Sequence, residues 1–165
     1  MDPATTLPFI KYFTCPEFTV REISDESELH AQIWQWHARR PGYIMDANVG
    51  LDDFIGLTWR NYCFFFDGVP QVCVSVNERQ PYGYEIHVAV ASGTHPGRVR
   101  DAVRWVGDLL TRNKCRMISW FPKEHRAARR LNAYFLQYET EMDVNGETWV
   151  RYAGDSVYWH NRHHG

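Results

Sequence analysis

The sequence lacks any long run of apolar residues. A membrane-spanning helix needs about 20 consecutive apolar residues, and no segment of this 165-residue chain approaches that length. Residues 1–11 also lack the basic-then-apolar plan of a secretory signal peptide. We therefore expect a protein that is made in the cytoplasm and has no membrane partner.

The sequence also lacks a large charge of either sign. Lys and Arg number 18 against 20 Asp and Glu, which gives a net charge of -2 at neutral pH. This balance gives no global electrostatic reason for nucleic acid or an anionic membrane as a partner. Hydrophobic residues make up 44% of the chain and charged residues 23%, which is the composition of a folded globular domain rather than a disordered one.

Cysteines are few and widely spaced. They stand at Cys15, Cys63, Cys73 and Cys115. No pair has the spacing of a zinc ligand set, and a domain of this size does not need disulfides. We expect four free, largely buried thiols in a reducing compartment.

Histidines gather near the C-terminus, at His160, His163 and His164. A metal site is one interpretation of such a cluster. Their spacing is irregular and no acidic residue stands near them in the sequence, so we predict a polar tail and no metal.

Hydrophobic periodicity predicts alternating strands and helices. Strands are predicted at 18–23, 62–66, 71–76, 84–90, 115–121, 138–144 and 147–152, with a last short strand at 157–159. Helices are predicted near 25–38, 51–59, 98–112 and 124–135. Asp67-Gly68 and Asn145-Gly146 are turn pairs typical of β-hairpins.

This order predicts one α/β domain. We expect an N-terminal arm at 1–17, the domain itself at 18–152 and a C-terminal strand or tail at 153–165. The meander of antiparallel strands leads into a strand–helix–strand unit between Tyr84 and Phe121, whose two strands should be parallel. The expected fold class is therefore a mixed sheet flanked by helices.

The residues from the strand Tyr84–Val88 to the helix segment Arg126–Arg129 carry a resemblance to a known family. They resemble the GCN5-related N-acetyltransferases (GNAT), in particular the small GNAT-like proteins that tailed bacteriophages encode. The resemblance implies that acetyl-CoA lies where two neighbouring parallel strands splay into a V. It also implies that the pyrophosphate meets backbone N–H groups at the start of the next helix, where the helix dipole is positive.

The resemblance implies a set of coenzyme-binding positions. They are Val88, Val90, Gly97, Arg98, Val99, Arg100, His125 and Ala128. Two positions depart from the family pattern: Thr94 replaces an Arg or Gln, and Val99 replaces a small residue. In addition, Pro96 removes one N–H donor from the phosphate loop. We expect these changes to weaken coenzyme binding.

The resemblance also implies catalytic groups. Glu85 and His87 lie on one face of the predicted strand, where either could accept a proton from an amine. The alternative is a solvated or hydrogen-bonded pair on a half-exposed strand. The family's general acid is a Tyr, but its position is taken by Asn132, whose amide is not an acid. Tyr134 is two residues further along the helix and should point elsewhere.

Two functions follow from this pattern. The first is a phage-encoded GNAT-like protein with degenerate acetyl-CoA motifs, which acts as a virion-associated structural or assembly protein. Its partners would be other virion or phage proteins, with a homo-oligomer as one form. The second is an active acetyl-CoA-dependent N-acetyltransferase whose acceptor pocket could be lined by Trp34, Trp36 and Trp59; the alternative is that these tryptophans are core.

Overall fold

The computed structural model describes residues 7–23, 27–38, 60–79 and 83–165. The described strands are β1 (Phe13–Thr14), β2 (Thr19–Ile23), β3 (Arg60–Phe66), β4 (Val69–Arg79), β5 (Gly83–Val90), β6 (Met117–Pro122), β7 (Gln137–Val144) and β8 (Glu147–Gly154). The described helices are α1 (Ser27–Ala38), α3 (Pro96–Arg112), α4 (Arg126–Phe135) and α5 (Ser156–His163). The helix predicted at 51–59 and residue Trp59 lie outside the described residues.

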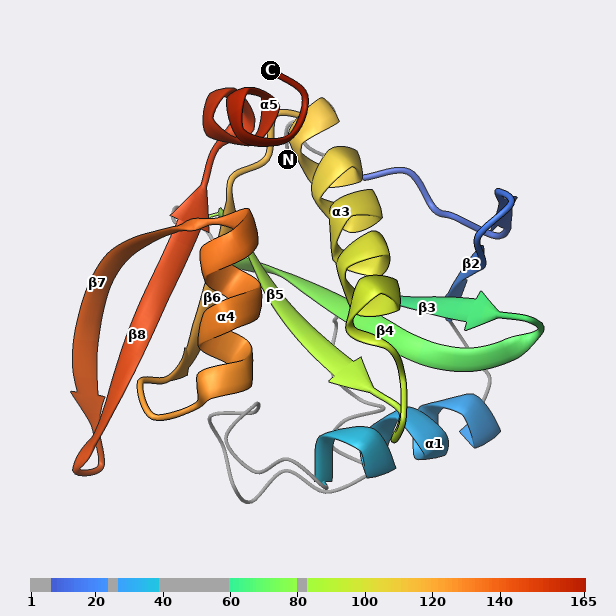
Figure 1. The fold of residues 1–165 in the computed structure, drawn as a ribbon, viewed down its shortest axis with the longest axis horizontal. Coiled ribbons are helices and arrows are strands. Elements are labelled where there is room, and N and C mark those ends of the chain that lie inside the picture. Colours follow the sequence, from blue (N-terminus) through green and yellow to red (C-terminus); the bar gives the residue numbers. More distant parts are fainter. Residues whose placement is uncertain (1–6, 24–26, 39–59, 80–82) are drawn as a thin grey trace. The chain divides into compact units, whose positions relative to one another are not determined.

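The strands form one mixed sheet. Their hydrogen-bonded order is β1-β2-β3-β4-β5-β6-β8-β7 (Figure 1). β5 and β6 are parallel, and the pairs β2–β3, β3–β4, β6–β8 and β7–β8 are antiparallel. The predicted α/β class with one parallel crossover is therefore confirmed.

The chain divides into two compact units. The first unit comprises Met1–Leu7, Glu78–Ile86 and Arg104–Gly165, and the second comprises Pro8–Asn77 and His87–Val103. Strand β5 and helix α3 run through both. The division into an arm, a domain and a tail stays a prediction.

The second unit has a core between α1 and its strands. Ile33 and Trp36 of α1 are buried together with residues of β2, β3, β4 and β5, and Trp34 packs against the same cluster. The cluster includes Cys63 and Cys73, and all four cysteines of the chain are free thiols. The prediction of free thiols is confirmed. Of the tryptophans considered for an acceptor pocket, two are described: Trp36 is part of this core, and Trp34 packs against it.

The first unit has an aromatic core between α3, α4 and α5. The indole of Trp159 on α5 is 1% exposed and stacks on Phe135 of α4 with ring centroids 5.6 Å apart. Its Nε1–H donates to Asp108 Oδ1 of α3 over 2.7 Å. These contacts fix the C-terminal helix on the two helices beside it.

Helix α5 corrects the prediction for the C-terminus. The predicted strand at 157–159 is wrong, because these residues lie in an α-helix. Asp155 caps that helix: its carboxylate accepts a hydrogen bond from the Tyr158 N–H over 2.8 Å. An N-cap aspartate satisfies an otherwise unpaired N–H of the first turn and favours helix over strand.

The tight turns agree with their sequence signals. Asp67 and Gly68 have φ values of 53° and 77°, and Asn145 and Gly146 have 50° and 84°. Two successive positive φ values are what a two-residue hairpin turn requires.

Among the helices of the described ranges, none is both long and apolar enough to cross a bilayer.

Candidate functional site

The loop before α3 holds the predicted phosphate-binding residues in the second unit. The loop turns at Gly93, which has a φ of 81°, and α3 begins at Pro96. The Gly97 N–H donates to Nδ1 of His95 over 2.9 Å, and the Arg98 N–H donates to the His95 carbonyl over 2.9 Å. Pro96 has no N–H. Of the first three residues of this helix, Pro96 therefore offers no donor, and Gly97 and Arg98 already donate to His95.

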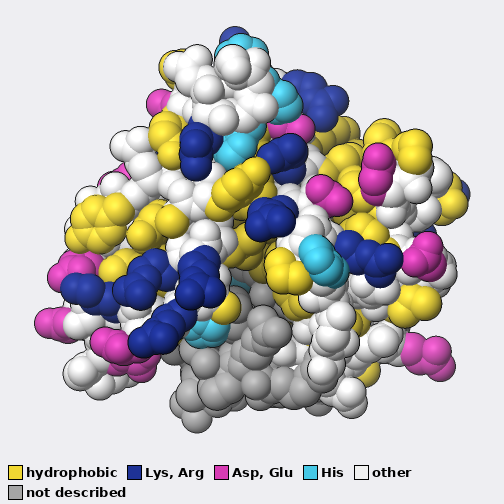
Figure 2. Space-filling view, viewed as in Figure 1, with side chains coloured by type: hydrophobic (Ala, Val, Ile, Leu, Met, Phe, Trp, Pro, Cys, Tyr) yellow, Lys and Arg dark blue, Asp and Glu magenta, His cyan; other side chains and the backbone are white. Residues whose placement is uncertain are grey.

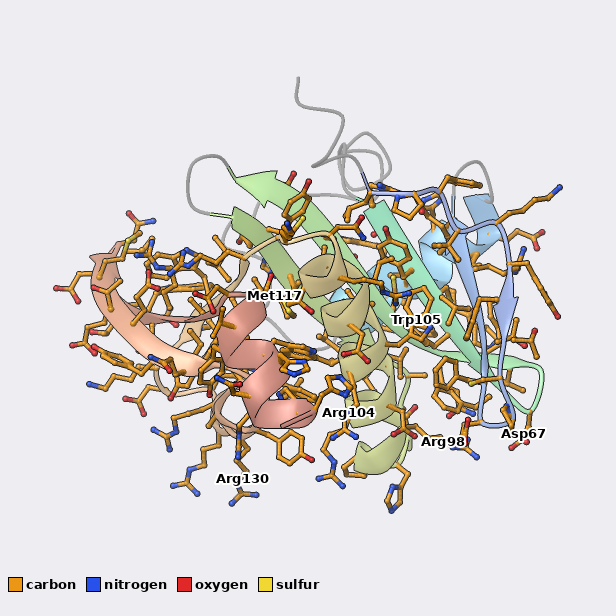
Figure 3. All side chains as sticks on the ribbon, turned by 90° about the horizontal axis from the view of Figure 1, so that it is seen from above. Asp67, Arg98, Arg104, Trp105, Met117 and Arg130 are labelled. Carbon is orange, nitrogen blue, oxygen red and sulfur yellow. The ribbon has the colours of Figure 1, made fainter. Side chains whose placement is uncertain are left out.

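The Arg98 side chain is directed at the β3–β4 hairpin. Its guanidinium donates to Gln71 Oε1 over 2.9 Å and to Asp67 Oδ2 over 3.2 Å (Figure 3). It also lies 5.1 Å from the centroid of the Phe66 ring. These contacts hold the guanidinium on the hairpin, although an exposed ion pair of this kind contributes only about 0–1 kcal/mol.

Strand β5 carries Glu85 and His87. Glu85 is 4% exposed and His87 is 6% exposed, so the expectation of a half-exposed strand is wrong. The strand is buried on both faces, since Val88 and Val90 are buried as well. Burial of ionisable groups is costly without partners, and both residues do interact within the chain. Their proposed role as bases stays a prediction.

The start of α4 holds the second set of predicted positions, in the first unit. His125 is the N-cap of the helix, and its Nδ1 accepts a hydrogen bond from the Ala128 N–H over 3.3 Å. Asn132 is 8% exposed, and its amide donates to the Ala128 carbonyl over 2.7 Å. The residue at the place of the general acid is thus a buried amide that is bonded to its own helix.

Tyr134 lies on a different face of α4 from Asn132. Its hydroxyl accepts a hydrogen bond from Arg104 Nη2 over 3.1 Å, and its ring is packed edge-on against Phe135. The side chain is 40% exposed. The prediction that Tyr134 points away from the position of Asn132 agrees with these contacts.

The predicted V-shaped opening involves β5 and β6. Their parallel register consists of Tyr84 with Met117 and Glu85 with Ile118, and both strands continue beyond these pairs. After Ile86, β5 belongs to the second unit, whereas β6 belongs to the first. The opening itself, and the meeting of the Gly97 loop with α4 across it, stay predictions.

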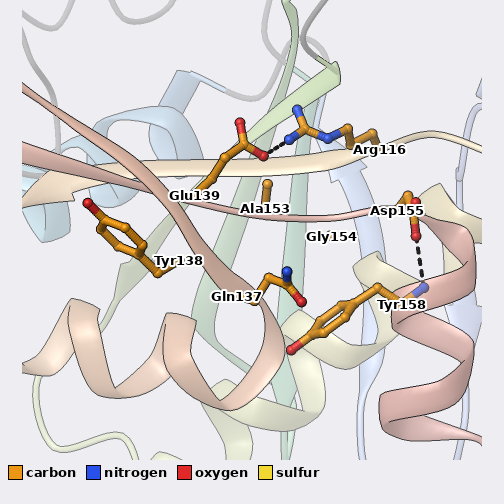
Figure 4. Close-up of a pocket in the computed structure, with 8 residues that line it drawn as sticks. All are labelled: Arg116, Gln137, Tyr138, Glu139, Ala153, Gly154, Asp155 and Tyr158. Atoms are coloured by element: carbon orange, nitrogen blue, oxygen red, sulfur yellow. Dashed lines mark hydrogen bonds and ion pairs between the residues drawn. The ribbon is translucent and has the colours of Figure 1, made fainter.

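A pocket that the sequence analysis missed lies in the first unit. It has a volume of about 190 Å³ and is lined by residues of β7, β8, α5 and the segment before β6 (Figure 4). Glu139, which lines the pocket, forms ion pairs with both Arg116 and Arg151. Burial, followed by the nearby charge of Arg151, lowers the pKa of Arg116. No sequence motif predicts this pocket, because its charged residues come from segments that are far apart in the sequence.

The C-terminal histidines are separately engaged. His164 Nε2 lies 2.7 Å from Asp108 Oδ1, and His163 Nε2 lies 3.3 Å from the Phe135 carbonyl. Within the described part of the chain, no three His, Cys, Asp or Glu side chains are arranged to hold a metal ion.

These contacts test the fit of coenzyme A to the two motifs. A pyrophosphate at the start of α3 would need N–H donors, but those of Gly97 and Arg98 are bonded to His95. Arg98, the cation beside that position, would have to leave its ion pair with Asp67. The first donors of α3 as arranged therefore do not fit the pyrophosphate of the coenzyme.

Comparisons with known proteins address the fold. No protein-family model matches the sequence, and no curated protein matches it at a significant level. Similar solved structures include YncA from Salmonella typhimurium, determined with its cofactor acetyl-CoA; the TM-score is 0.67 and the identity 15%, over 85% of this chain and 94% of that one.

Two further structures carry the same likeness. Ribosomal-protein-S5-alanine acetyltransferase from Vibrio fischeri aligns over 90% of this chain and 98% of its own, with a TM-score of 0.66 and 15% identity. RimJ from Mycobacterium smegmatis, in complex with CoA-disulfide, aligns over 85% of this chain and 82% of its own, with a TM-score of 0.65 and 12% identity. The chain therefore has the mixed α/β fold of the GCN5-related N-acetyltransferases.

Proposed function

We propose that this GNAT-fold protein has lost the use of acetyl-CoA and acts as a structural or assembly protein, with a bacteriophage virion as its setting. The observation that carries the proposal is that the motif residues are used for internal contacts. His95 and Asp67 occupy the donors of the α3 start, and Asn132 is bonded within α4. The virion setting comes from the phage-type resemblance of the sequence.

The α3 start supports the loss of coenzyme binding through its hydrogen-bond balance. To admit a pyrophosphate, the His95 ring would have to leave the Gly97 N–H, and Arg98 would have to leave both Gln71 and Asp67. Each such bond contributes about 0.5–1.5 kcal/mol, and somewhat more when a group is charged. Phosphate contacts would therefore have to replace several existing bonds rather than add new ones.

The α4 position supports the loss of chemistry. A departing thiolate is protonated most effectively by an acid whose pKa is matched to the reaction. The Asn132 amide is no acid, and it already donates its N–H to Ala128. The Tyr134 hydroxyl is on another face of the helix, where it contacts Arg104.

Calorimetry and thermal unfolding with acetyl-CoA test the first half of the proposal. We expect no heat of binding and no change in melting temperature at about 1 mM ligand. A dissociation constant of about 10 μM would stabilise the chain by about 2.7 kcal/mol at that concentration. For a chain of this size such stabilisation raises the melting temperature by about 5–11 °C, so an unchanged melting temperature is a decisive result.

The second half of the proposal is tested on particles. Mass spectrometry of purified virions from a host in which this chain is made should find it at a fixed ratio to the major capsid protein. A chain that stays in the lysate and is absent from the particles would refute the virion role.

An active N-acetyltransferase is the second candidate. It is favoured by the CoA ligands of the structures YncA and RimJ. The variant His95→Ala separates the two candidates, because it frees the Gly97 N–H. Binding of acetyl-CoA by the unchanged chain, with turnover of an amine, would support the enzyme. Binding by the variant alone would support the structural role and identify His95 as the group that closes the site.

A further inference from the structure

The outer face of α4 carries three arginines that folding does not use. Ala128, Asn132 and Phe135 form the buried face of this helix. Arg126, Arg129 and Arg130 are exposed on the other side. None of the three side chains forms a hydrogen bond or an ion pair with the residues that the structure describes.

The placement of these arginines is unfavourable for the helix. Two of them, Arg126 and Arg129, lie in the first turn, where the positive end of the helix dipole disfavours cations. α4 contains no Asp or Glu with which they could pair at a spacing of three or four residues. The nearby Lys123 has a carboxylate partner in Glu141, which the arginines lack.

Two further arginines, one from α3 and one from α5, extend this basic surface beyond the three arginines of α4. Arg104 of α3 donates to the Tyr134 hydroxyl, and the Arg162 guanidinium of α5 lies 5.8 Å from the centroid of the same ring. Arg104 and Arg162 are both exposed. We call this set, Arg104, Arg126, Arg129, Arg130, Tyr134 and Arg162, the α4 patch. Lys and Arg side chains gather over the N-terminal half of α4 (Figure 2), and Arg104 and Arg130 project to the same side (Figure 3).

The size of the α4 patch favours a polymer over a small anion. Arg126 and Tyr134 are eight residues apart on one helix, a rise of about 12 Å. Duplex DNA presents one phosphate charge per about 1.7 Å of its axis, or about seven over that length. A single phosphate group would reach one or two of these arginines, whereas a nucleic-acid backbone would reach them all.

The residue types suit phosphate oxygens as well as carboxylate oxygens, and the regular spacing of phosphate charges along a nucleic acid selects between the two. All five cations are arginines, whose planar guanidinium is suited to phosphate oxygens. We infer that the α4 patch binds the phosphate backbone of nucleic acid without sequence specificity. The net charge of -2 does not oppose this, because the patch is local. The inference does not rest on the proposed loss of coenzyme use.

Fluorescence anisotropy with labelled oligonucleotides of about 20 nucleotides, one single-stranded and one duplex, tests the inference. The patch variant is Arg126→Gln with Arg129→Gln and Arg130→Gln. The control variant removes the same charge elsewhere, as Lys11→Gln with Arg112→Gln and Lys114→Gln, all of which are exposed. We expect the patch variant to weaken binding by about tenfold or more and the control by less than about threefold.

The salt dependence supplies a second readout. With five contacts, log K should fall with log salt at a slope of about -3.5 for the single strand and -4.5 for the duplex. The patch variant should reduce the single-strand slope by about 2. Both variants should keep the melting temperature, since every substituted side chain is exposed.

Four outcomes would overturn the inference. They are no binding by the unchanged chain, equal losses in the patch and control variants, displacement of the oligonucleotide by poly-glutamate at equal charge, and loss of acetyl-CoA binding in the patch variant. The third would indicate an acidic protein partner, and the fourth would assign the arginines to a coenzyme site. Failure of coenzyme binding in the unchanged chain would leave the oligonucleotide result unaffected, so the two proposals fail separately.

Discussion

Replacing Gly107 by Ala should destabilise the protein, although the local helix would favour the change. Gly107 lies inside α3, where Ala is better than Gly by about 1 kcal/mol. A Cβ at this position would overlap Cζ2 and Cη2 of Trp159. The sign of the effect depends on whether the indole can yield.

The surroundings of Trp159 indicate that it cannot move within its site. The ring is 1% exposed, stacks on Phe135 and donates to Asp108. Expelling it forfeits about 3–5 kcal/mol, the usual cost of truncating a buried Trp. Subtracting the helix gain of about 1 kcal/mol leaves a net loss of about 2–4 kcal/mol. For a chain of this size that corresponds to a fall in melting temperature of about 4–16 °C.

A double-mutant cycle followed by far-UV circular dichroism isolates the contact. In a Trp159→Ala background the space beside Gly107 is open, so Gly107→Ala should raise stability by about 1 kcal/mol. The reversal of sign between the two backgrounds is the expected result. A neutral or stabilising Gly107→Ala in the unchanged chain, or an equal loss in both backgrounds, would refute the steric reasoning.

Three further predictions concern α5 and the buried thiols. Asp155→Ala removes the N-cap of α5 and should cost about 1 kcal/mol in a denaturant titration; an unchanged midpoint would contradict the capping role. Burial lowers the pKa of His163 below its ordinary value of about 6.5. Protonation of His163 therefore favours the unfolded chain, and the free energy of unfolding should fall as the pH drops below about 6.5. His163→Gln should flatten that part of the pH profile. Burial raises the pKa of the Cys73 thiol to about 12, so iodoacetamide at pH near 8 should modify Cys73 only in the unfolded chain; labelling in the folded chain would contradict this.

The sequence predicted those parts of the fold that local chemistry determines. Asp67-Gly68 and Asn145-Gly146 determine their hairpins, because only a few residue pairs tolerate two positive φ values. Helix α3 follows from its continuous apolar stripe. The failure at 157–159 has a similar local origin: the strand preference of Val, Tyr and Trp obscured Asp155-Ser156, which is a helix start signal.

The candidate site was less predictable because its contacts are between distant residues. Arg98 and Asp67 are 31 positions apart, and nothing in either neighbourhood indicates that they pair. The hydrogen bond from the Gly97 N–H to His95 Nδ1 is local, but histidine is not among the residues that usually cap a helix, so the sequence did not indicate it. The burial of Glu85 and His87 was not indicated either, because an alternating strand predicts one exposed face.

The two faces of helix α4 differ: the inner face is used for packing, and the outer face is available for function. Its inner face is fully occupied: Asn132 bonds to Ala128, Ala128 bonds to His125, and Phe135 stacks on Trp159. A residue bound in this way can be exchanged only at a cost in stability. Its outer arginines carry no such constraint and even oppose the helix dipole. Charges that oppose the helix dipole, and that no side chain of the described residues neutralises, are best explained by an external partner, so the outer surface of this helix, rather than the position of Asn132, is where function should be sought.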